Sequence, residues 1–266
     1  MTPGKRVVYI TGITGIIGRF LVEGLRNEHR LRGNSRRGTP MEGAEVAKGD
    51  VADREFMREQ LQGADTVIHL GANSHPSAPW ESVLHSNIEG TYEVFEAARL
   101  AGARRVIFAS SNHVTGILTQ LAQDMDVTVP VRPDGFYGVS KAFGETLGRF
   151  YADRYGISVL NYRIGWILAE TDEARLVEVF KRFRHAGPLM WLSVRDCVEA
   201  FRCGIEADPS LTYGIYYIVS NNRDMLWDIS NARAEIGYHP KDDLGALFDR
   251  CGAPYDFRVP RQGLSH

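Results

Sequence analysis

Short apolar runs alternate with longer amphipathic stretches along most of the chain. A short apolar run is typical of a strand buried on both faces, whereas apolar side chains at every third or fourth position are typical of a helix. The runs predict strands over residues 6–11, 46–51, 65–70, 105–111, 157–164 and 213–219, and a second strand is predicted over 29–32. The amphipathic stretches predict helices after residue 18, over 53–61, 80–101, 137–155 and 194–201, and a charged amphipathic segment over 172–185.

Strands that alternate with helices are typical of one parallel sheet covered on both faces. We therefore predict an α/β fold with a Rossmann-type doubly wound sheet, and we assign residues 1–164 to a dinucleotide-binding domain. The pattern loosens after Arg163, so residues 165–266 are expected to form a small C-terminal substrate cap interleaved with the last strand. In such folds ligands bind beyond the carboxyl ends of the strands. The motifs described next all fall at that edge.

The first predicted strand leads directly into a glycine turn, Gly12-Ile-Thr-Gly-Ile-Ile-Gly18, and then into a helix. Strand, glycine turn and helix in succession form the context in which backbone N–H groups hold a pyrophosphate at a helix N-terminus. Gly12 and Gly15 would allow the tight turn and the close approach of the phosphates, and Gly18 would let the helix pack on the strand. A tight turn without a ligand is the competing interpretation.

The segment after the second strand is basic and contains no acid. An Asp or Glu at this place holds the ribose 2′-hydroxyl of NAD, whereas arginines accept the 2′-phosphate of NADP. Gly33 would leave room for the adenosine ribose. Hydrogen-bond donors to it would come from Asn34, Ser35, Arg36 and Arg37. This favours NADP, with NAD as the alternative and an ordinary solvated basic loop as the competing interpretation. At the end of the third strand, Asp50 is placed to meet the adenine amino group.

Tyr137 and Lys141 lie four residues apart at the start of a predicted helix, which puts them on one helix face. An ammonium there would favour the phenolate. A free tyrosine has a pKa of about 10, so lowering it to near neutrality needs roughly 4 kcal/mol, which a lysine and a cationic cofactor ring together can supply. By itself the pattern is common by chance. Here it follows a strand that ends in Ser110 and Ser111.

Composition narrows the class of protein. The chain has 266 residues, 44% of them hydrophobic, and a net charge of −2, so nothing indicates a nucleic acid or a membrane surface as partner. Three cysteines without a CxxC spacing indicate neither a disulfide framework nor a metal site. The N-terminus has no signal-peptide pattern, and no apolar run approaches the roughly 20 residues of a membrane span. We expect a cytoplasmic protein.

With these motifs the chain resembles the extended short-chain dehydrogenases/reductases, the NAD-dependent epimerase/dehydratase superfamily, over nearly its whole length. More narrowly, Asn87-Ile-Glu-Gly, Phe108-Ala-Ser-Ser-Asn-His, Arg132-Pro-Asp-Gly and Trp191-Leu-Ser resemble uronate dehydrogenases and haloarchaeal NAD-dependent glucose-6-phosphate dehydrogenases. The resemblance implies oxidation of the anomeric hydroxyl of a cyclic acidic sugar, such as a hexuronate or a sugar phosphate, to a lactone. It also implies a homodimer or higher homo-oligomer, with residues 80–101 and 137–155 at the dimer contact.

The resemblance further implies the roles of individual residues. Ser111, Tyr137 and Lys141 would be the catalytic set, with Tyr137 as the base. The cofactor would contact Tyr137, Lys141 and a set from several loops: Gly12, Thr14, Gly15, Ile16, Ile17, Gly18, Asn34, Ser35, Arg36, Arg37, Asp50, Val51, Leu70, Gly71, Ala72, Asn87 and Ile164. The sugar would contact Ser74, His75, Ser111, Asn112, His113, Tyr137, Trp166 and Arg184. No metal is expected.

Three positions depart from uronate dehydrogenases. Those enzymes carry an arginine a few residues before Trp-x-Ser, and Arg184 is displaced from that place by a residue or two. Trp166 stands where they have a small or polar residue, and the basic segment after the second strand replaces an acid. Two other functions stay open: a nucleotide-sugar epimerase or dehydratase, and a non-catalytic NADP-binding sensor. The first usually needs a larger C-terminal domain, and the second commonly lacks the tyrosine or the lysine.

Overall fold

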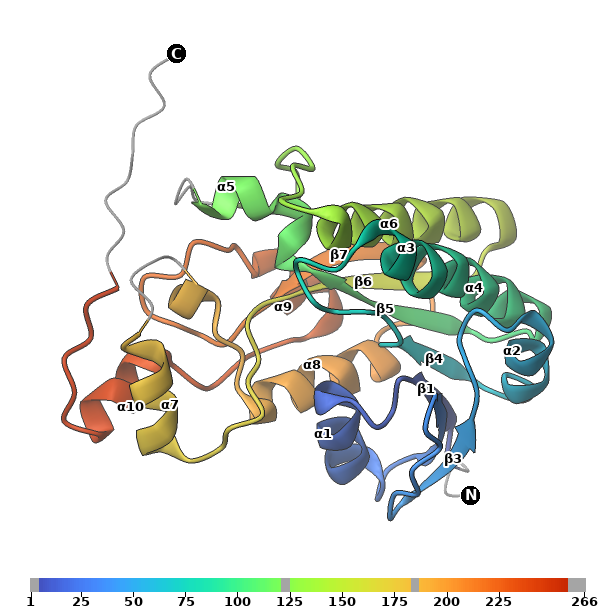
Figure 1. Cartoon of the computed structure of the whole chain (residues 1–266), viewed down its shortest axis with the longest axis horizontal. Helices are drawn as coiled ribbons and strands as arrows, with labels where there is room; N and C mark the ends of the chain where they lie inside the picture. Colours follow the sequence, from blue (N-terminus) through green and yellow to red (C-terminus); the bar gives the residue numbers. More distant parts are fainter. Residues whose placement is uncertain (1–4, 121–124, 183–186, 258–266) are drawn as a thin grey trace.

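The computed structural model describes residues 5–120, 125–182 and 187–257. These residues form a sheet of seven strands in the order β3-β2-β1-β4-β5-β6-β7, every neighbouring pair parallel (Figure 1). The strands are β1 (Val7–Thr11), β2 (Arg30–Ser35), β3 (Ala44–Lys48), β4 (Thr66–His69), β5 (Arg105–Ser111), β6 (Ser158–Ile164) and β7 (Tyr213–Ile218). After β3 the chain crosses back past β1 to form β4. The predicted α/β doubly wound sheet is therefore confirmed, with its switch point between β1 and β4.

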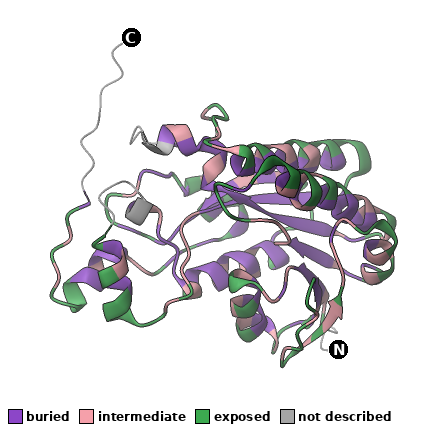
Figure 2. Ribbon diagram, in the orientation of Figure 1, coloured by how far each residue is buried: buried purple, intermediate pink, exposed green. Residues whose placement is uncertain are grey.

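Helices cover both faces of the sheet. One face packs against α2 (Arg54–Gln60), α4 (Gly90–Leu100) and α6 (Phe136–Tyr155), and the other against α1 (Ile16–Leu25), α8 (Val194–Glu206) and α9 (Ser230–Ile236) (Figure 1). Every residue of β4, β5 and β6 is buried, which explains why their sequences read as continuous apolar runs rather than as alternating ones (Figure 2). The edge strand β3 is only partly covered.

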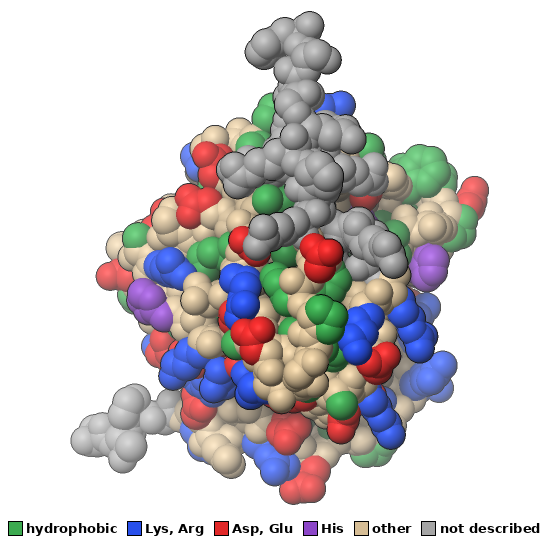
Figure 3. Space-filling model, turned by 90° about the vertical axis from the view of Figure 1, so that its left-hand side faces the viewer, with side chains coloured by type: hydrophobic (Ala, Val, Ile, Leu, Met, Phe, Trp, Pro, Cys, Tyr) green, Lys and Arg blue, Asp and Glu red, His purple; other side chains and the backbone are tan. Residues whose placement is uncertain are grey.

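A third apolar cluster lies beside the sheet, beyond β6 and β7. It is built around Phe180, Trp227 and Phe248, which come from segments far apart in the sequence. Its helices are α5 (Gly116–Gln120), α7 (Glu173–Phe180), the 3₁₀ turn η3 (Gly187–Met190) and α10 (Leu244–Arg250). On the face that carries α7 and α10, acidic and basic side chains are interspersed (Figure 3), and an Arg250–Glu173 ion pair joins the two helices.

The predicted elements differ from the observed ones mainly at their ends. Strand β2 continues to Ser35, because its last residues pair with β3, and β3 itself ends at Lys48. The expected single helix over 80–101 is divided into α3 (Trp80–Val83), a π-helical segment η1 (Leu84–Glu89) and α4. The short helices α5, α9 and α10 were missed, since none of them shows a long enough periodic pattern.

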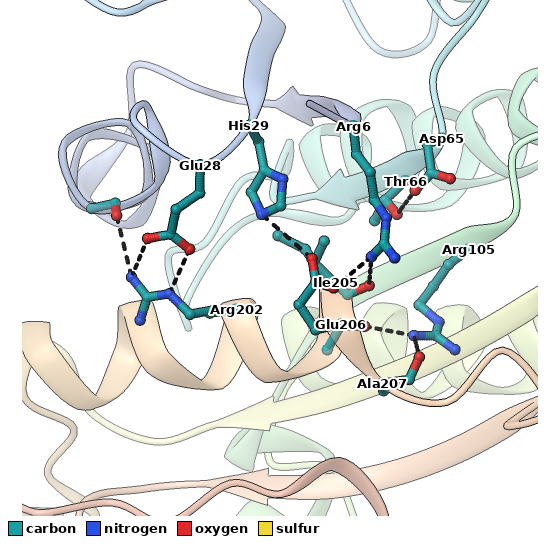
Figure 4. A network of polar contacts seen from close by, with 12 residues as sticks. Arg6, Glu28, His29, Asp65, Thr66, Arg105, Arg202, Ile205, Glu206 and Ala207 are labelled. Carbon is teal, nitrogen blue, oxygen red and sulfur yellow. Dashed lines mark hydrogen bonds and ion pairs between the residues drawn. The ribbon is translucent and has the colours of Figure 1, made fainter. Parts of the chain in front are cut away.

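A set of polar contacts ties α8 to the amino-terminal edge of the sheet (Figure 4). Arg105, the first residue of β5, is fully buried and donates hydrogen bonds to the carbonyls of Gly204 and Ala207 at the end of α8, at 2.7 and 2.8 Å. Burial lowers the pKa of Arg105 to about 10. A cation at the last carbonyls of a helix is favourable. These contacts lie at the edge opposite to the one where β5 delivers Ser111.

Candidate active site

One large cavity, of about 940 Å³, opens at the carboxyl-terminal edge of the sheet. Its lining comes from the turns after β1, β2, β3, β4, β5 and β6 and from the start of α6. This is the crevice in which a doubly wound sheet binds its ligands, at and around the switch point.

The structure brings most of the predicted site residues together at this cavity. Those that line it are Gly12, Thr14, Gly15, Ile16, Ile17, Gly18, Asn34, Ser35, Arg36, Arg37, Asp50, Val51, Leu70, Gly71, Ala72, Ser74, Ser111, Asn112, His113, Tyr137, Lys141, Ile164 and Trp166. Two predicted residues, His75 and Asn87, do not line it. Arg184 lies outside the described residues.

The glycine turn has the geometry of an anion cradle. Gly12 has φ +65°, a conformation that favours glycine, and a Cβ there would also come within 3.1 Å of Gly71. A Cβ on Gly18 would lie 2.2 Å from the carbonyl oxygen of Ile13, so only glycine lets α1 begin this close to the turn. Helix α1 has no side-chain cap and no acid in its first turn. Its first N–H groups and the positive end of its dipole therefore suit a pyrophosphate.

The adenosine end of the cavity is polar and basic. Ser35 is buried and accepts a hydrogen bond from the backbone of Gly38, which shapes the loop, whereas Arg36 and Arg37 are exposed and make no ion pair with any described residue. Asp50 accepts from the backbone N–H of Ala52 at 2.9 Å and lies 3.5 Å from His85. The expected role of Gly33 was wrong: a Cβ there would meet the Ile10 carbonyl oxygen and Ile13, so Gly33 makes room for the chain's own first turn.

Tyr137, Lys141 and Ser111 meet where α6 crosses the end of β5. The tyrosine and the lysine are 8% and 3% exposed, and the Lys141 Nζ lies 5.6 Å from the centroid of the Tyr137 ring and 4.9 Å from that of Phe108. The Ser111 hydroxyl donates to the Asn112 Oδ1 at 3.3 Å, and it accepts from the His113 backbone N–H at 3.2 Å. No described residue pairs with the ammonium of Lys141 by a hydrogen bond or an ion pair, so its N–H groups are available to a ligand in the cavity.

Burial dominates the electrostatics of this group. It raises the pKa of Tyr137 to about 12, while the nearby Ser111 hydroxyl acts in the opposite direction. Burial also lowers the pKa of Lys141 to about 7. In the protein without a ligand, burial thus shifts both side chains toward their neutral forms. A cationic cofactor ring bound beside them would favour the phenolate.

Asn87 holds two elements of the site together instead of lining it. It is buried in η1, where its Nδ2 donates to the Asn73 carbonyl and to the Ser140 Oγ, at 3.1 and 3.0 Å. Its Oδ1 accepts from the Asn73 backbone N–H at 2.8 Å. Asn87 does not line the cavity, and these hydrogen bonds tie the loop after β4 to Ser140, the residue next to Lys141. His75 is exposed in the same loop.

The remaining part of the lining comes from the segments that follow β5 and β6. Asn112 and His113 continue from Ser111 into the 3₁₀ turn η2 (Asn112–Thr115). Trp166 lies two residues beyond Ile164, the register partner of Ser111. Its ring packs edge-on against Phe180 at 5.2 Å, and its backbone N–H donates to the Met190 carbonyl at 2.8 Å.

Several residues of the lining were missed from the sequence. Most are neighbours of predicted ones: Arg19, Gly49, Pro76, Ala109, Ser110, Gly165 and Ile167, with Thr39 and Ser86 a few residues from predicted positions. Met190 has no sequence signal, because only its backbone pairing with Trp166 brings it to the cavity.

None of the helices in the described ranges is long and apolar enough to cross a membrane. Across the same ranges, no group of three or more His, Cys, Asp or Glu side chains is arranged to hold a metal ion.

Known proteins with similar sequences and structures were compared with this chain. A model of the NAD dependent epimerase/dehydratase family matches residues 8–218. An L-arabinose 1-dehydrogenase (NAD(P)(+)) of Haloferax volcanii is 37% identical over 253 residues, covering 91% of this chain and 99% of that protein. An NAD-dependent glucose-6-phosphate dehydrogenase of the same organism is 38% identical over 267 residues, covering 94% and 98%. The structure of a uronate dehydrogenase mutant from Agrobacterium tumefaciens, complexed with NAD, superimposes with a TM-score of 0.79 at 32% identity and covers 93% of this chain and 89% of that one.

Proposed function

Since the chain belongs to the NAD-dependent epimerase/dehydratase family, we propose that it is an NAD(P)-dependent sugar dehydrogenase that oxidises the anomeric hydroxyl of a cyclic sugar to a lactone. The observation that carries this proposal is the meeting of Ser111, Tyr137 and Lys141 in one cavity with the uncapped N-terminus of α1. Relatives over nearly the full length of the chain are named as sugar dehydrogenases of this kind.

The residues present fit a nicotinamide dinucleotide. Its pyrophosphate would be held by Gly12, Gly15 and the first turn of α1. Its adenosine would contact Asp50 and residues 34–37, and its nicotinamide ribose would contact Lys141. When bound, this cofactor accepts the hydride that leaves the anomeric carbon.

Tyr137 is the proposed general base for the anomeric hydroxyl. Its Oη would take the hydroxyl proton as the carbonyl of the lactone forms. The Ser111 hydroxyl would donate a hydrogen bond to the sugar oxygen as negative charge develops on it. Lys141 would donate to the ribose and stabilise the phenolate, since an ammonium in a buried site is far more effective than one in water.

For the sugar itself we propose an acidic ring, such as a hexuronate or a sugar phosphate, held by Ser74, Asn112 and His113 and bounded by Trp166. The supporting observations are that these four residues line the cavity, that Asn112 and His113 follow Ser111 directly, and that Trp166 lies two residues beyond Ile164, the register partner of Ser111. The described part of residues 165–266 is proposed to cover the substrate, because α7 and α10 belong to one apolar cluster against which Trp166, a residue of the cavity lining, packs.

A screen of sugars tests the proposal directly. We expect reduced nicotinamide to appear, by its ultraviolet absorbance, with an acidic aldose and either cofactor. The matching methyl glycoside, which has no anomeric hydroxyl, should give no turnover, and turnover with it would contradict oxidation at that carbon. If a neutral aldose were the sole good substrate, the proposed acidic substrate would be wrong, while the proposed oxidation at the anomeric carbon would still hold.

We propose NADP as the preferred cofactor, because Arg36 and Arg37 are exposed at the adenosine end without acidic partners among the described residues. Replacing both with Ala should raise the KM for NADP by about tenfold to a hundredfold, the range for hydrogen bonds to a charged group, and leave the KM for NAD within about twofold. Steady-state kinetics with each cofactor measures this. An unchanged NADP/NAD ratio would sink the proposed role of the arginines, and Arg30→Ala, on the far end of β2, is the control.

A homodimer through α4 and α6 is proposed from the apolar side chains that these two packed helices expose, among them Tyr92, Val139 and Phe150. Sedimentation equilibrium should give twice the chain mass for the wild type and the single-chain mass for Phe150→Asp. A monomeric wild type would reject the proposal.

A further inference from the structure

His113 is held by a carboxylate that none of the roles above includes. Its Nδ1 lies 2.9 Å from both carboxylate oxygens of Asp134, in the Pro133-Asp134-Gly135 turn just before α6. An ionised carboxylate can only accept hydrogen bonds, so Nδ1 must carry the hydrogen and donate it. The contact lies near the surface, with the two side chains 26% and 18% exposed.

The backbone around this pair is fixed as well. A Cβ on Gly138 would lie 2.3 Å from the carbonyl oxygen of His113, so η2 is seated directly on the first turn of α6. The Arg132 backbone N–H donates to the Val114 carbonyl at 2.9 Å, which joins the turn that carries Asp134 to η2. The His113 ring also meets the Tyr137 ring edge-on, with 5.6 Å between the centroids. Neither the ring nor its backbone is therefore loosely placed.

The second ring nitrogen has a different environment. His113 lines the cavity, and its Nε2 makes no hydrogen bond with any described residue, while Nδ1 is occupied by Asp134. Because Asp134 fixes the proton on Nδ1, the neutral ring presents an unshared electron pair at Nε2. This nitrogen can then accept a hydrogen bond from a hydroxyl in the cavity.

We propose that Asp134 is a positioning residue of the sugar site. Through the Nδ1–H of His113 it fixes the tautomer and the orientation of the imidazole. The imidazole Nε2 then accepts a hydrogen bond from a sugar hydroxyl beside the one that Tyr137 deprotonates. The proposal rests on the proposed sugar dehydrogenase activity for its ligand. Asp134 itself touches neither sugar nor cofactor in this role.

A double-mutant cycle with the sugar found in the screen tests the link between the two residues. Asp134→Ala and His113→Ala should each raise the KM for the sugar by about tenfold, the value of one hydrogen bond, with the KM for the cofactor within about twofold. In the His113→Ala background, Asp134→Ala should add less than about twofold, because Asp134 acts through the ring. Asp134→Asn, which can still offer an oxygen to Nδ1–H, should recover part of the loss. Asp153→Ala, which removes an exposed carboxylate further along α6, is the matched control.

The proposal would be overturned if the two substitutions raised the KM for the sugar by factors that multiply in the double variant. It would also be overturned if Asp134→Ala raised the KM for the cofactor instead of that for the sugar. Long-range proton–nitrogen NMR of the imidazole gives a readout that needs no substrate. It should show His113 as the Nδ1–H tautomer in the wild type and a shift toward Nε2–H in Asp134→Ala. An unchanged tautomer in that variant would overturn the proposal even with an active enzyme. A wild type with the expected tautomer but without activity on any sugar would refute the proposed function and, with it, the sugar as the ligand of Nε2.

Discussion

Tyr137→Phe is expected to lower kcat for sugar oxidation by about three orders of magnitude or more, and to leave cofactor binding within about twofold of the wild type. Positioned acid–base groups contribute roughly 10²–10⁴-fold, and no other hydroxyl of comparable acidity lines this part of the cavity among the described residues. The variant keeps the ring that packs against His113 and Lys141. Initial rates and a fluorescence titration of the reduced cofactor measure the two quantities.

Retention of turnover by Tyr137→Phe would remove the tyrosine from the mechanism. The pH profile gives a second check in the wild type. Because burial raises the pKa of Tyr137, its protonated form dominates at neutral pH, so the oxidation rate should rise as the pH increases toward the pKa that applies in the complex. The cationic ring of a bound oxidised cofactor would lower that pKa, so the rise should reach its plateau well below pH 12. Since burial lowers the pKa of Lys141 to about 7, loss of the lysine charge over the same range acts against the rise. A rise of equal size in the residual activity of Tyr137→Phe would contradict a tyrosine base.

Glu145→Ala is expected to reduce the free energy of unfolding by about 3–5 kcal/mol, the cost of leaving a buried charge without its partner. Glu145 lies one turn after Lys141 on α6, and its carboxylate accepts two hydrogen bonds from Arg163 and one from Ser110. Burial by itself would lower the pKa of Arg163, but the hydrogen bonds and charge of Glu145 outweigh it and hold that pKa above its usual value. Arg163 is 1% exposed, so water cannot replace the missing carboxylate. Urea unfolding followed by circular dichroism measures the loss.

The control for Glu145→Ala is Asp153→Ala, on the same helix α6. Arg149 and Asp153 form an exposed ion pair at 2.7 Å, and such pairs contribute well under about 1 kcal/mol, so Asp153→Ala should change stability very little. Equal losses in Glu145→Ala and Asp153→Ala would show that the buried pair is not a special source of stability. The double variant Glu145→Leu with Arg163→Met, in which no charge is left buried, should recover a large part of the loss.

Local sequence carried the prediction of the fold and most of the cavity. Apolar runs located β1, β4, β5, β6 and β7, because strands buried on both faces are largely apolar. The strands β2 and β3 carry exposed polar residues, and only their approximate positions were predicted. Parallel strands place their carboxyl ends at one edge, so Gly12, Asp50, Gly71 and Ser111 could be expected together although they are far apart in sequence. Strand ends were less well predicted, as at β2, because they depend on pairing with β3 rather than on the strand's own residues.

The interactions that depend on distant partners were not visible in the sequence. The electrostatic state of Tyr137 and Lys141 is set by burial under the surrounding elements, which a helix spacing of four residues does not report. Asn87 stands at a recognisable position, yet its contacts with Asn73 and Ser140 depend on the π-helical segment η1, which carries no local pattern. Met190 reached the cavity only through a backbone pairing with Trp166.

The Tyr137–Lys141 pair shows what can be predicted from the sequence and what depends on the tertiary structure. The sequence by itself determined that the two side chains share a helix face beside a serine-bearing strand, since helical spacing and parallel-sheet topology are local and general rules. Only the tertiary structure decided the environment of that pair: the depth of its burial, the Asp134–His113 contact beside it and the Glu145–Arg163 pair beneath it. Packing of distant segments sets dielectric, hydrogen-bond partners and orientation, and no single segment encodes these quantities.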